Sequence, residues 1–123
     1  MSRDNYSCGR NSEEAAARFL TAQGLRIISR NYKSRAAEID IIAREKDTIC
    51  FVEVKSRKDE RFGTAAESVT PAKQRKISEA ALGFLKENNL FDRRCRFDVV
   101  AISLQDGKEK IEYIRDAFIA REE

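Results

Sequence analysis

Two neighbouring apolar segments, both interrupted by charged side chains, most constrain the fold of this chain. Residues 38–57, EIDIIAREKDTICFVEVKSR, predict two β-strands joined by a turn at Lys46 and Asp47. Strand alternation predicts that one face of the first strand carries Glu38, Asp40 and Ile42, and that one face of the second carries Ile49, Phe51, Glu53 and Lys55. Pairing of the two strands therefore predicts Asp40 beside Glu53 and Lys55.

The remaining segments predict helices and strands around this hairpin. Ser12 is a candidate cap and Gly24 a stop for a first helix, and Thr70 and Pro71 suit the start of a second. The expected order is a helix from Ser12, strands at 25–32, 38–44 and 48–57, a loop at 58–69, a helix at about 71–88, a strand at 95–104 and an edge strand at 109–114. This order indicates a small α/β domain in which helices flank a mixed sheet.

The chain predicts one domain, residues 1–123, because its length suits a single core and no repeat or linker divides it. Residues 1–10 and 120–123 are expected to be flexible. Lys and Arg number 24 against 21 Asp and Glu, and the net charge of +3 permits nucleic-acid binding without requiring it. The acid-free run LRIISRNYKSR, which includes Arg35, offers its cations either to phosphates or to solvent.

The sequence contains no histidine, which removes Ser-His-Asp hydrolysis, Cys-His proteolysis and His-based phosphodiester cleavage. Its three widely spaced cysteines indicate neither a disulfide framework nor a Cys-x-x-Cys metal site. With no apolar run of about 18 residues and no secretory leader visible, we expect a cytoplasmic protein without a membrane partner. Any catalysis therefore rests on carboxylates, lysines, hydroxyls or thiols.

The acids within the apolar strands have two interpretations. A carboxylate in an apolar strand is costly to desolvate without a cation or hydrogen-bond donors, and Mg²⁺ can be held by one or two acids plus a substrate phosphate. Such an ion would polarise a phosphodiester and activate a water, with Lys55 orienting or deprotonating that water or stabilising the transition state. In the other interpretation, Glu53 and Lys55 form a surface ion pair worth under about 1 kcal/mol.

Glu13, in the first predicted helix, extends the acidic set. Lying one turn before Ala16 and Ala17, it would point toward the same sheet edge, where it would orient a metal-bound water or touch a second ion. Alternatively, it is an ordinary acid near a helix N-terminus. The combination of Glu13, Asp40 and the Glu53-x-Lys55 pair is more specific than any member alone, and it favours a metal-dependent site.

At these residues the sequence resembles the PD-(D/E)XK, or restriction-endonuclease-like, superfamily, in which an Asp on one strand precedes Asp/Glu-x-Lys on the next. It is more closely similar to the bacterial YraN family, grouped with endonucleases akin to archaeal Holliday-junction resolvases. The matching segments are GRNSEEAAARFLTAQGLRIISRNY, EIDIIAR, FVEVKSR, the FG of 62–63, SVTPAKQRKI and RFDVV. The resemblance implies the three-layer restriction-endonuclease-like fold and a Mg²⁺- or Mn²⁺-dependent endodeoxyribonuclease, acting on branched or structured DNA in repair or recombination.

The resemblance also implies roles for individual residues. Asp40 and Glu53 would be metal ligands, Lys55 the catalytic lysine and Glu13 the helical acid. Weaker candidates for nucleic-acid contacts, which would otherwise be solvated polar side chains, are Arg35, Arg57, Lys73 and Gln74. Paired cuts in a junction would suit an isologous homodimer, and no small-molecule cofactor is expected. The rival functions are a catalytically silent nucleic-acid-binding module of the same fold and a metal-independent interaction protein whose acids are structural.

Overall fold

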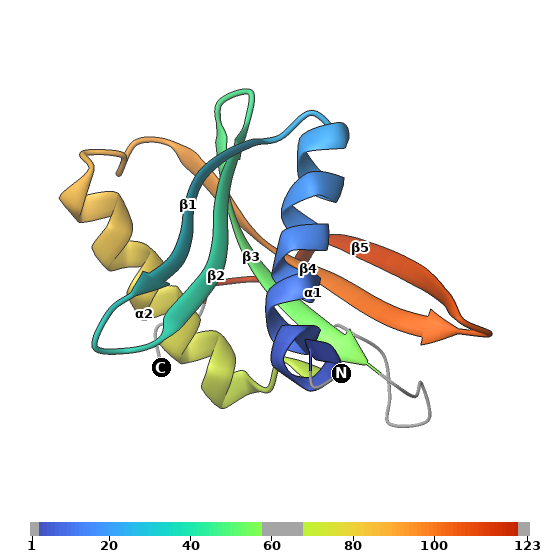
Figure 1. Ribbon diagram of the computed structural model, residues 1–123. Helices are drawn as coiled ribbons and strands as arrows, with labels where there is room; N and C mark the ends of the chain where they lie inside the picture. Colours follow the sequence, from blue (N-terminus) through green and yellow to red (C-terminus); the bar gives the residue numbers. More distant parts are fainter. Residues whose placement is uncertain (1–2, 58–67, 121–123) are drawn as a thin grey trace.

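The computed structural model describes residues 3–57 and 68–120, and its elements follow the predicted order (Figure 1). They are α1 (Arg3–Ala22), β1 (Arg26–Lys33), β2 (Glu38–Glu45), β3 (Thr48–Arg57), α2 (Pro71–Glu87), β4 (Arg94–Gln105) and β5 (Lys108–Phe118). The strands form a five-stranded sheet in the order β1-β2-β3-β4-β5. Strands β3 and β4 are parallel and the other neighbours antiparallel, so the predicted mixed sheet is confirmed.

The two helices cover opposite faces of the sheet, which gives three layers (Figure 1). On the α1 face, the buried core includes Ala16, Leu20, Ile41, Val52 and Val100. On the α2 face, it includes Ile77, Phe84, Phe51, Phe97 and Val99. The apolar side chains of β2, β3 and β4 are therefore buried on both faces, which explains why these strands are nearly continuous apolar runs.

Helix α2 connects the parallel strands β3 and β4, since parallel neighbours require a crossover. The predicted cap is confirmed: Thr70 Oγ1 accepts a hydrogen bond of 3.2 Å from the Lys73 backbone nitrogen, and Pro71 lies in the first turn. The first turn of α2 is thereby fixed in orientation. The predicted loop before it falls largely on residues 58–67, outside the described residues.

Two predicted boundaries were wrong. Helix α1 begins at Arg3, and Ser12 is buried within the helix instead of capping it. The apolar period begins only after Ser12, so the preceding polar residues gave no helical signal. Strand β5 extends to Phe118, beyond the predicted end at 114, because Phe118 pairs with Phe97 and completes the core on the α2 face. Neither of the two described helices is apolar over a long enough stretch to cross a membrane.

Strict alternation also fails in β2. Ile39 and Ile42 both pack in the core on the α2 face, while Ile41 packs on the α1 face. The predicted common face of Glu38, Asp40 and Ile42 is therefore wrong. The neighbouring strand β1 is irregular at the same level, because Asn31 has a φ of 56° in the left-handed region. The break in alternation occurs around Asp40.

Candidate functional site

The acidic cluster lies where β2 separates from β3. Backbone pairing of the two strands runs from Glu45 and Thr48 to Ile41 and Val52. Beyond this point, Asp40 Oδ2 accepts a hydrogen bond of 2.8 Å from the Val54 backbone nitrogen. The carboxylate thus takes the place of a strand carbonyl, which holds Asp40 against the end of β3 that carries Glu53 and Lys55.

Glu53 is the centre of the cluster. Its side chain is buried, and its Oε2 lies 3.7 Å from Lys55 Nζ and 3.2 Å from Lys73 Nζ. Lys55 is on the same strand and Lys73 is in the first turn of α2. Two cations from different elements therefore share one carboxylate oxygen, and the predicted neighbourhood of Glu53 and Lys55 is confirmed. The contact of Lys73 with this pair was not predicted.

The electrostatics of Asp40 indicate unbalanced negative charge. Burial and the neighbouring Glu53 carboxylate raise the pKa of Asp40 to about 7, and Glu13 and Glu38 contribute in the same direction. The hydrogen bond from Val54 opposes the shift. A cation bound beside Asp40 would favour its ionised form and lower this pKa.

The pKa values of Lys55 and Lys73 are shifted in opposite directions. Burial, followed by contact with Lys73, lowers the pKa of Lys55. The pKa of Lys73 is raised, first by its interaction with Lys55 and then by attraction to Glu53. Of the two side chains, Lys55 releases its proton more readily, whereas Lys73 stays cationic.

Glu13 reaches this region through a residue that the sequence analysis missed. The Asn31 amide lies 3.0 Å from both Glu13 Oε1 and Glu38 Oε2, and its nitrogen faces them because carboxylates only accept hydrogen bonds. Asn31 therefore ties α1 to β2. The sequence signal was slight: Asn tolerates left-handed backbone better than most residues.

The carboxylates fit a metal ion that completes its coordination from outside the protein. Within the described residues, no three acidic or thiol side chains gather closely enough to hold a metal ion by themselves. Asp40 and Glu53 offer carboxylate oxygens on adjacent strands, and Mg²⁺ commonly takes one or two carboxylates together with water and substrate phosphate. Asp40 and Glu53 thus provide the two carboxylates that such an ion would require from the protein.

The other predicted residues are more dispersed. Gln74 Nε2 donates to the Val69 carbonyl at 2.9 Å, which reinforces the start of α2. Arg35 is exposed in the turn between β1 and β2. Arg57 ends β3, and its side chain lies outside the described part of the structure.

Asp98 belongs to a separate, structural network. It is fully buried and accepts hydrogen bonds from Arg96 at 3.0 Å, from the Tyr113 hydroxyl at 2.7 Å and from the Asp116 backbone nitrogen at 2.8 Å. Arg96 in turn pairs with Glu45 at 2.9 Å. With this many partners, the Asp98 carboxylate is satisfied without a metal ion.

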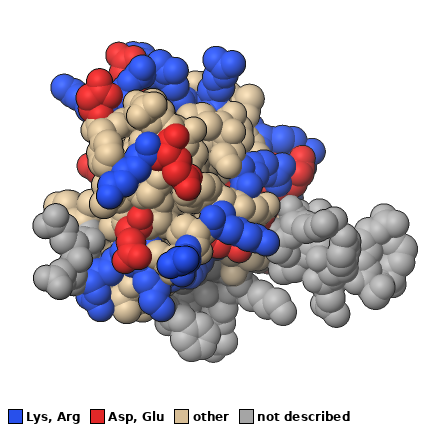
Figure 2. All heavy atoms as spheres, turned by 90° about the vertical axis from the view of Figure 1, so that its left-hand side faces the viewer, with Lys and Arg blue, Asp and Glu red and all other residues tan. Residues whose placement is uncertain are grey.

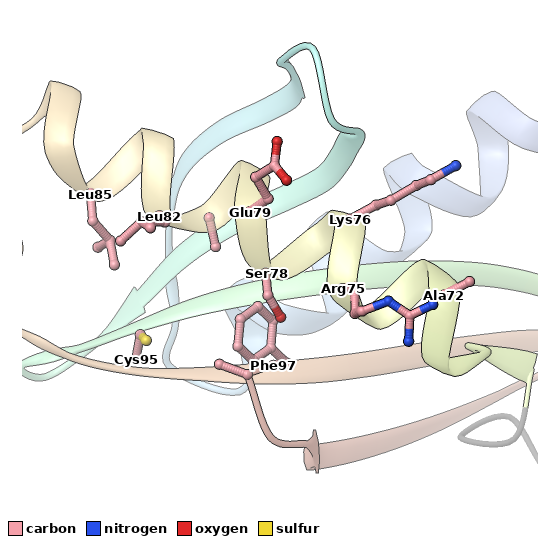
Figure 3. Close-up of a pocket in the computed structure, with 11 residues that line it drawn as sticks. Ala72, Arg75, Lys76, Ser78, Glu79, Leu82, Leu85, Cys95 and Phe97 are labelled. Carbon is pink, nitrogen blue, oxygen red and sulfur yellow. The ribbon is translucent and has the colours of Figure 1, made fainter. Parts of the chain in front are cut away.

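The outer surface near α2 offers two further features. Basic and acidic side chains are interspersed on the face in Figure 2 instead of forming a single basic patch. A groove of about 610 Å³ runs between α2 and the start of β4 (Figure 3). Its lining comprises Ala72, Arg75, Lys76, Ser78, Glu79, Ala81, Leu82, Leu85, Cys95, Phe97 and Ala120. This groove is distinct from the acidic cluster.

The fold and the site define a class: an α/β protein with two acids and two lysines clustered where neighbouring strands diverge. The chain belongs to the uncharacterised protein family UPF0102, whose model matches residues 12–102. A UPF0102 protein of Pelobacter propionicus is 48% identical over 118 residues, 94% of this chain and 84% of the relative. One from Rhodococcus opacus is 48% identical over 115 residues, 93% of this chain and 98% of the relative.

Proposed function

We propose that this protein is a Mg²⁺- or Mn²⁺-dependent endonuclease of the restriction-endonuclease-like class that hydrolyses phosphodiester bonds in DNA. The observation that carries the proposal is the convergence of Asp40, Glu53 and Lys55 at the divergence of β2 and β3. This arrangement joins two neighbouring carboxylates to a lysine whose pKa is lowered by burial. All three side chains are partly or largely buried, so the environment strengthens their charges.

In this proposal Asp40 and Glu53 hold the metal ion, which supplies charge neutralisation at the phosphate and a more acidic bound water. Lys55 lies 3.7 Å from Glu53 and is placed to accept a proton from the attacking water or to orient it. The Val54 backbone nitrogen holds the Asp40 carboxylate in position. Glu13, held by Asn31, orients water at the α1 side of the cluster.

The preference for branched or otherwise structured DNA rests on the resemblance to the junction-resolving endonucleases, and DNA is the proposed partner on the same ground. Repair or recombination, a cytoplasmic location and an isologous dimer belong to the same proposal. Paired cuts across a junction would suit two copies of the chain related by a twofold axis. The net charge of +3 is compatible with a polyanionic substrate.

The test is a cleavage assay with the purified full-length chain. Fluorescent DNA junctions, flaps, duplexes and single strands are incubated with Mg²⁺, Mn²⁺ or a chelator. We expect metal-dependent cutting that Lys55→Ala abolishes while leaving DNA binding intact, and that Asp40→Asn also abolishes. Asp98→Asn is a control, because it changes a buried acid outside the site. The folded fraction of this variant should still cut DNA.

Three outcomes would contradict the proposal. Cutting that survives in both Asp40→Asn and Lys55→Ala would place the activity elsewhere or in a contaminant. Salt-sensitive DNA binding without cleavage under any metal would favour the silent binding module. Absence of both DNA binding and Mn²⁺ binding, together with a stabilising Glu53→Gln, would favour an interaction protein with structural acids.

A further inference from the structure

The contact of both lysines with the same oxygen of Glu53 restricts how a metal ion can bind. Lys73 Nζ lies 3.2 Å and Lys55 Nζ 3.7 Å from Glu53 Oε2. A divalent ion coordinated by that carboxylate would face two ammonium groups at short range. Like charges at such separations repel strongly in a partly buried site, so an ammonium that stays charged has to move away.

Lys73 is the side chain better able to leave. Its side chain is 43% exposed, compared with 23% for Lys55. It extends from α2, whereas Lys55 and Glu53 lie two residues apart on one face of β3. A half-exposed ion pair is weak, and the flexible lysine stem allows the ammonium to reach another anion nearby.

We propose that Lys73 is the resident counter-cation of Glu53, that a divalent metal ion displaces it, and that the freed ammonium then binds the phosphate of the substrate. This inference rests on the proposed function, because it takes Asp40 and Glu53 as the metal ligands. Lys73 is thus a positioning residue that exchanges one anion for another. The metal-free site keeps its buried carboxylate neutralised, and the loaded site gains a cation for the substrate.

The position of Lys73 suits the second part of this exchange. It lies in the first turn of α2, where Thr70 fixes the turn and the helix dipole also favours an anion. A phosphate drawn to a metal ion that Asp40 and Glu53 would hold could therefore reach Lys73 on the α2 side. The Lys73 side chain would therefore weaken metal binding and strengthen DNA binding.

The experiment uses full-length wild type, Lys73→Gln and Lys76→Gln. Lys76 is the control because it lies on the same helix but lines the groove beside β4 (Figure 3). Calorimetric titration with Mn²⁺ in the absence of DNA should show about two- to fivefold tighter binding by Lys73→Gln, the range of a partly exposed ion pair. Lys76→Gln should match wild type.

DNA affinity is measured with a fluorescent junction and Mn²⁺ in a Lys55→Ala background, where the DNA stays intact. Adding Lys73→Gln should weaken binding by about two- to fivefold. Adding Lys76→Gln should change it less. Thermal melting checks that each variant is folded, and Mn²⁺ should raise the melting temperature of Lys73→Gln more than that of wild type.

The possible failures are distinguishable. Unchanged or weaker Mn²⁺ binding by Lys73→Gln overturns the displacement if wild type binds the ion. Equal tightening in Lys76→Gln overturns it as well, because the effect would then be general charge repulsion. If adding Lys73→Gln leaves the DNA affinity unchanged, the proposal that the freed Lys73 ammonium binds the substrate phosphate is overturned. Absence of Mn²⁺ binding by every variant overturns the metal site itself, and the proposed function with it.

Discussion

The Asp40 carboxylate accepts a hydrogen bond of 2.8 Å from the Val54 backbone nitrogen at the point where β2 and β3 separate. A side chain here replaces the backbone carbonyl that a continuing antiparallel pair would supply. The bond keeps the carboxylate beside Glu53 even though like charge and burial oppose its ionisation. The two strands thus hold the Asp40 carboxylate at a position where a bound cation would stabilise its ionised form.

Stability should fall between about pH 4 and pH 7 because of Asp40. Its pKa is about 7 in the folded protein, against an ordinary value of 3.8. In this window the unfolded chain releases the Asp40 proton while the folded chain retains it, so rising pH favours unfolding until both forms are ionised. Asp40→Asn should therefore gain stability over wild type at pH 8, on the order of 4 kcal/mol for a shift from 3.8 to about 7, and little at pH 4.

Urea unfolding of both proteins at pH 4 and pH 8, without metal, checks this prediction. Adding Mn²⁺ at pH 8 should narrow the difference, because the ion would neutralise the ionised carboxylate of wild type. A difference between the two proteins that is the same at both pH values would show that Asp40 does not titrate in this range.

Glu53→Gln should destabilise the metal-free protein by about 1–2 kcal/mol, because it leaves the ammonium groups of Lys55 and Lys73 facing each other without the shared carboxylate. Glu14→Gln is the control, because Glu14 pairs with Arg30 at 3.2 Å on an exposed surface and its loss should cost little. Chemical denaturation measures the free energy of unfolding of both variants. A stabilising Glu53→Gln would contradict the shared-carboxylate arrangement.

Asn31→Gly should cost about 1 kcal/mol, since glycine accepts the left-handed φ of 56° but removes the amide between Glu13 and Glu38. Asn89→Gly is a matched control: Asn89 has a φ of 54° at the end of α2 and no part in the cluster. Its replacement should be neutral within a few tenths of a kcal/mol. Equal effects at the two positions in urea unfolding would argue that the Asn31 amide is unimportant.

Tyr113→Phe should destabilise the protein by about 1–2 kcal/mol, because it removes the hydroxyl that donates to buried Asp98 at 2.7 Å. Asp98→Asn should cost about 3 kcal/mol, because Arg96 loses one of its two charged partners inside the protein. Neither change should alter the affinity for Mn²⁺ in a calorimetric titration of folded protein. Loss of Mn²⁺ binding in Tyr113→Phe would mean that this network belongs to the metal site.

Much of the fold and part of the site were predictable because their causes are local. The turn at Lys46 and Asp47, the cap at Thr70 and the helical spacing of Ile77 and Phe84 depend on neighbours within a few residues. The proximity of Glu53 and Lys55 follows from strand alternation alone. The start of α1 was missed because its first turns carry polar residues and lack an apolar period.

The sequence by itself determined the order of helices and strands, the apolar content of both faces of the sheet and the presence of acids within its central strands. Only the tertiary structure decided that α2 brings Lys73 to Glu53, that Asn31 joins Glu13 to Glu38, and that alternation breaks around Asp40. Periodicity is a short-range property of the backbone. The approach of α2 and the separation of β2 from β3 depend instead on how the whole core packs, and that packing sets which charges meet.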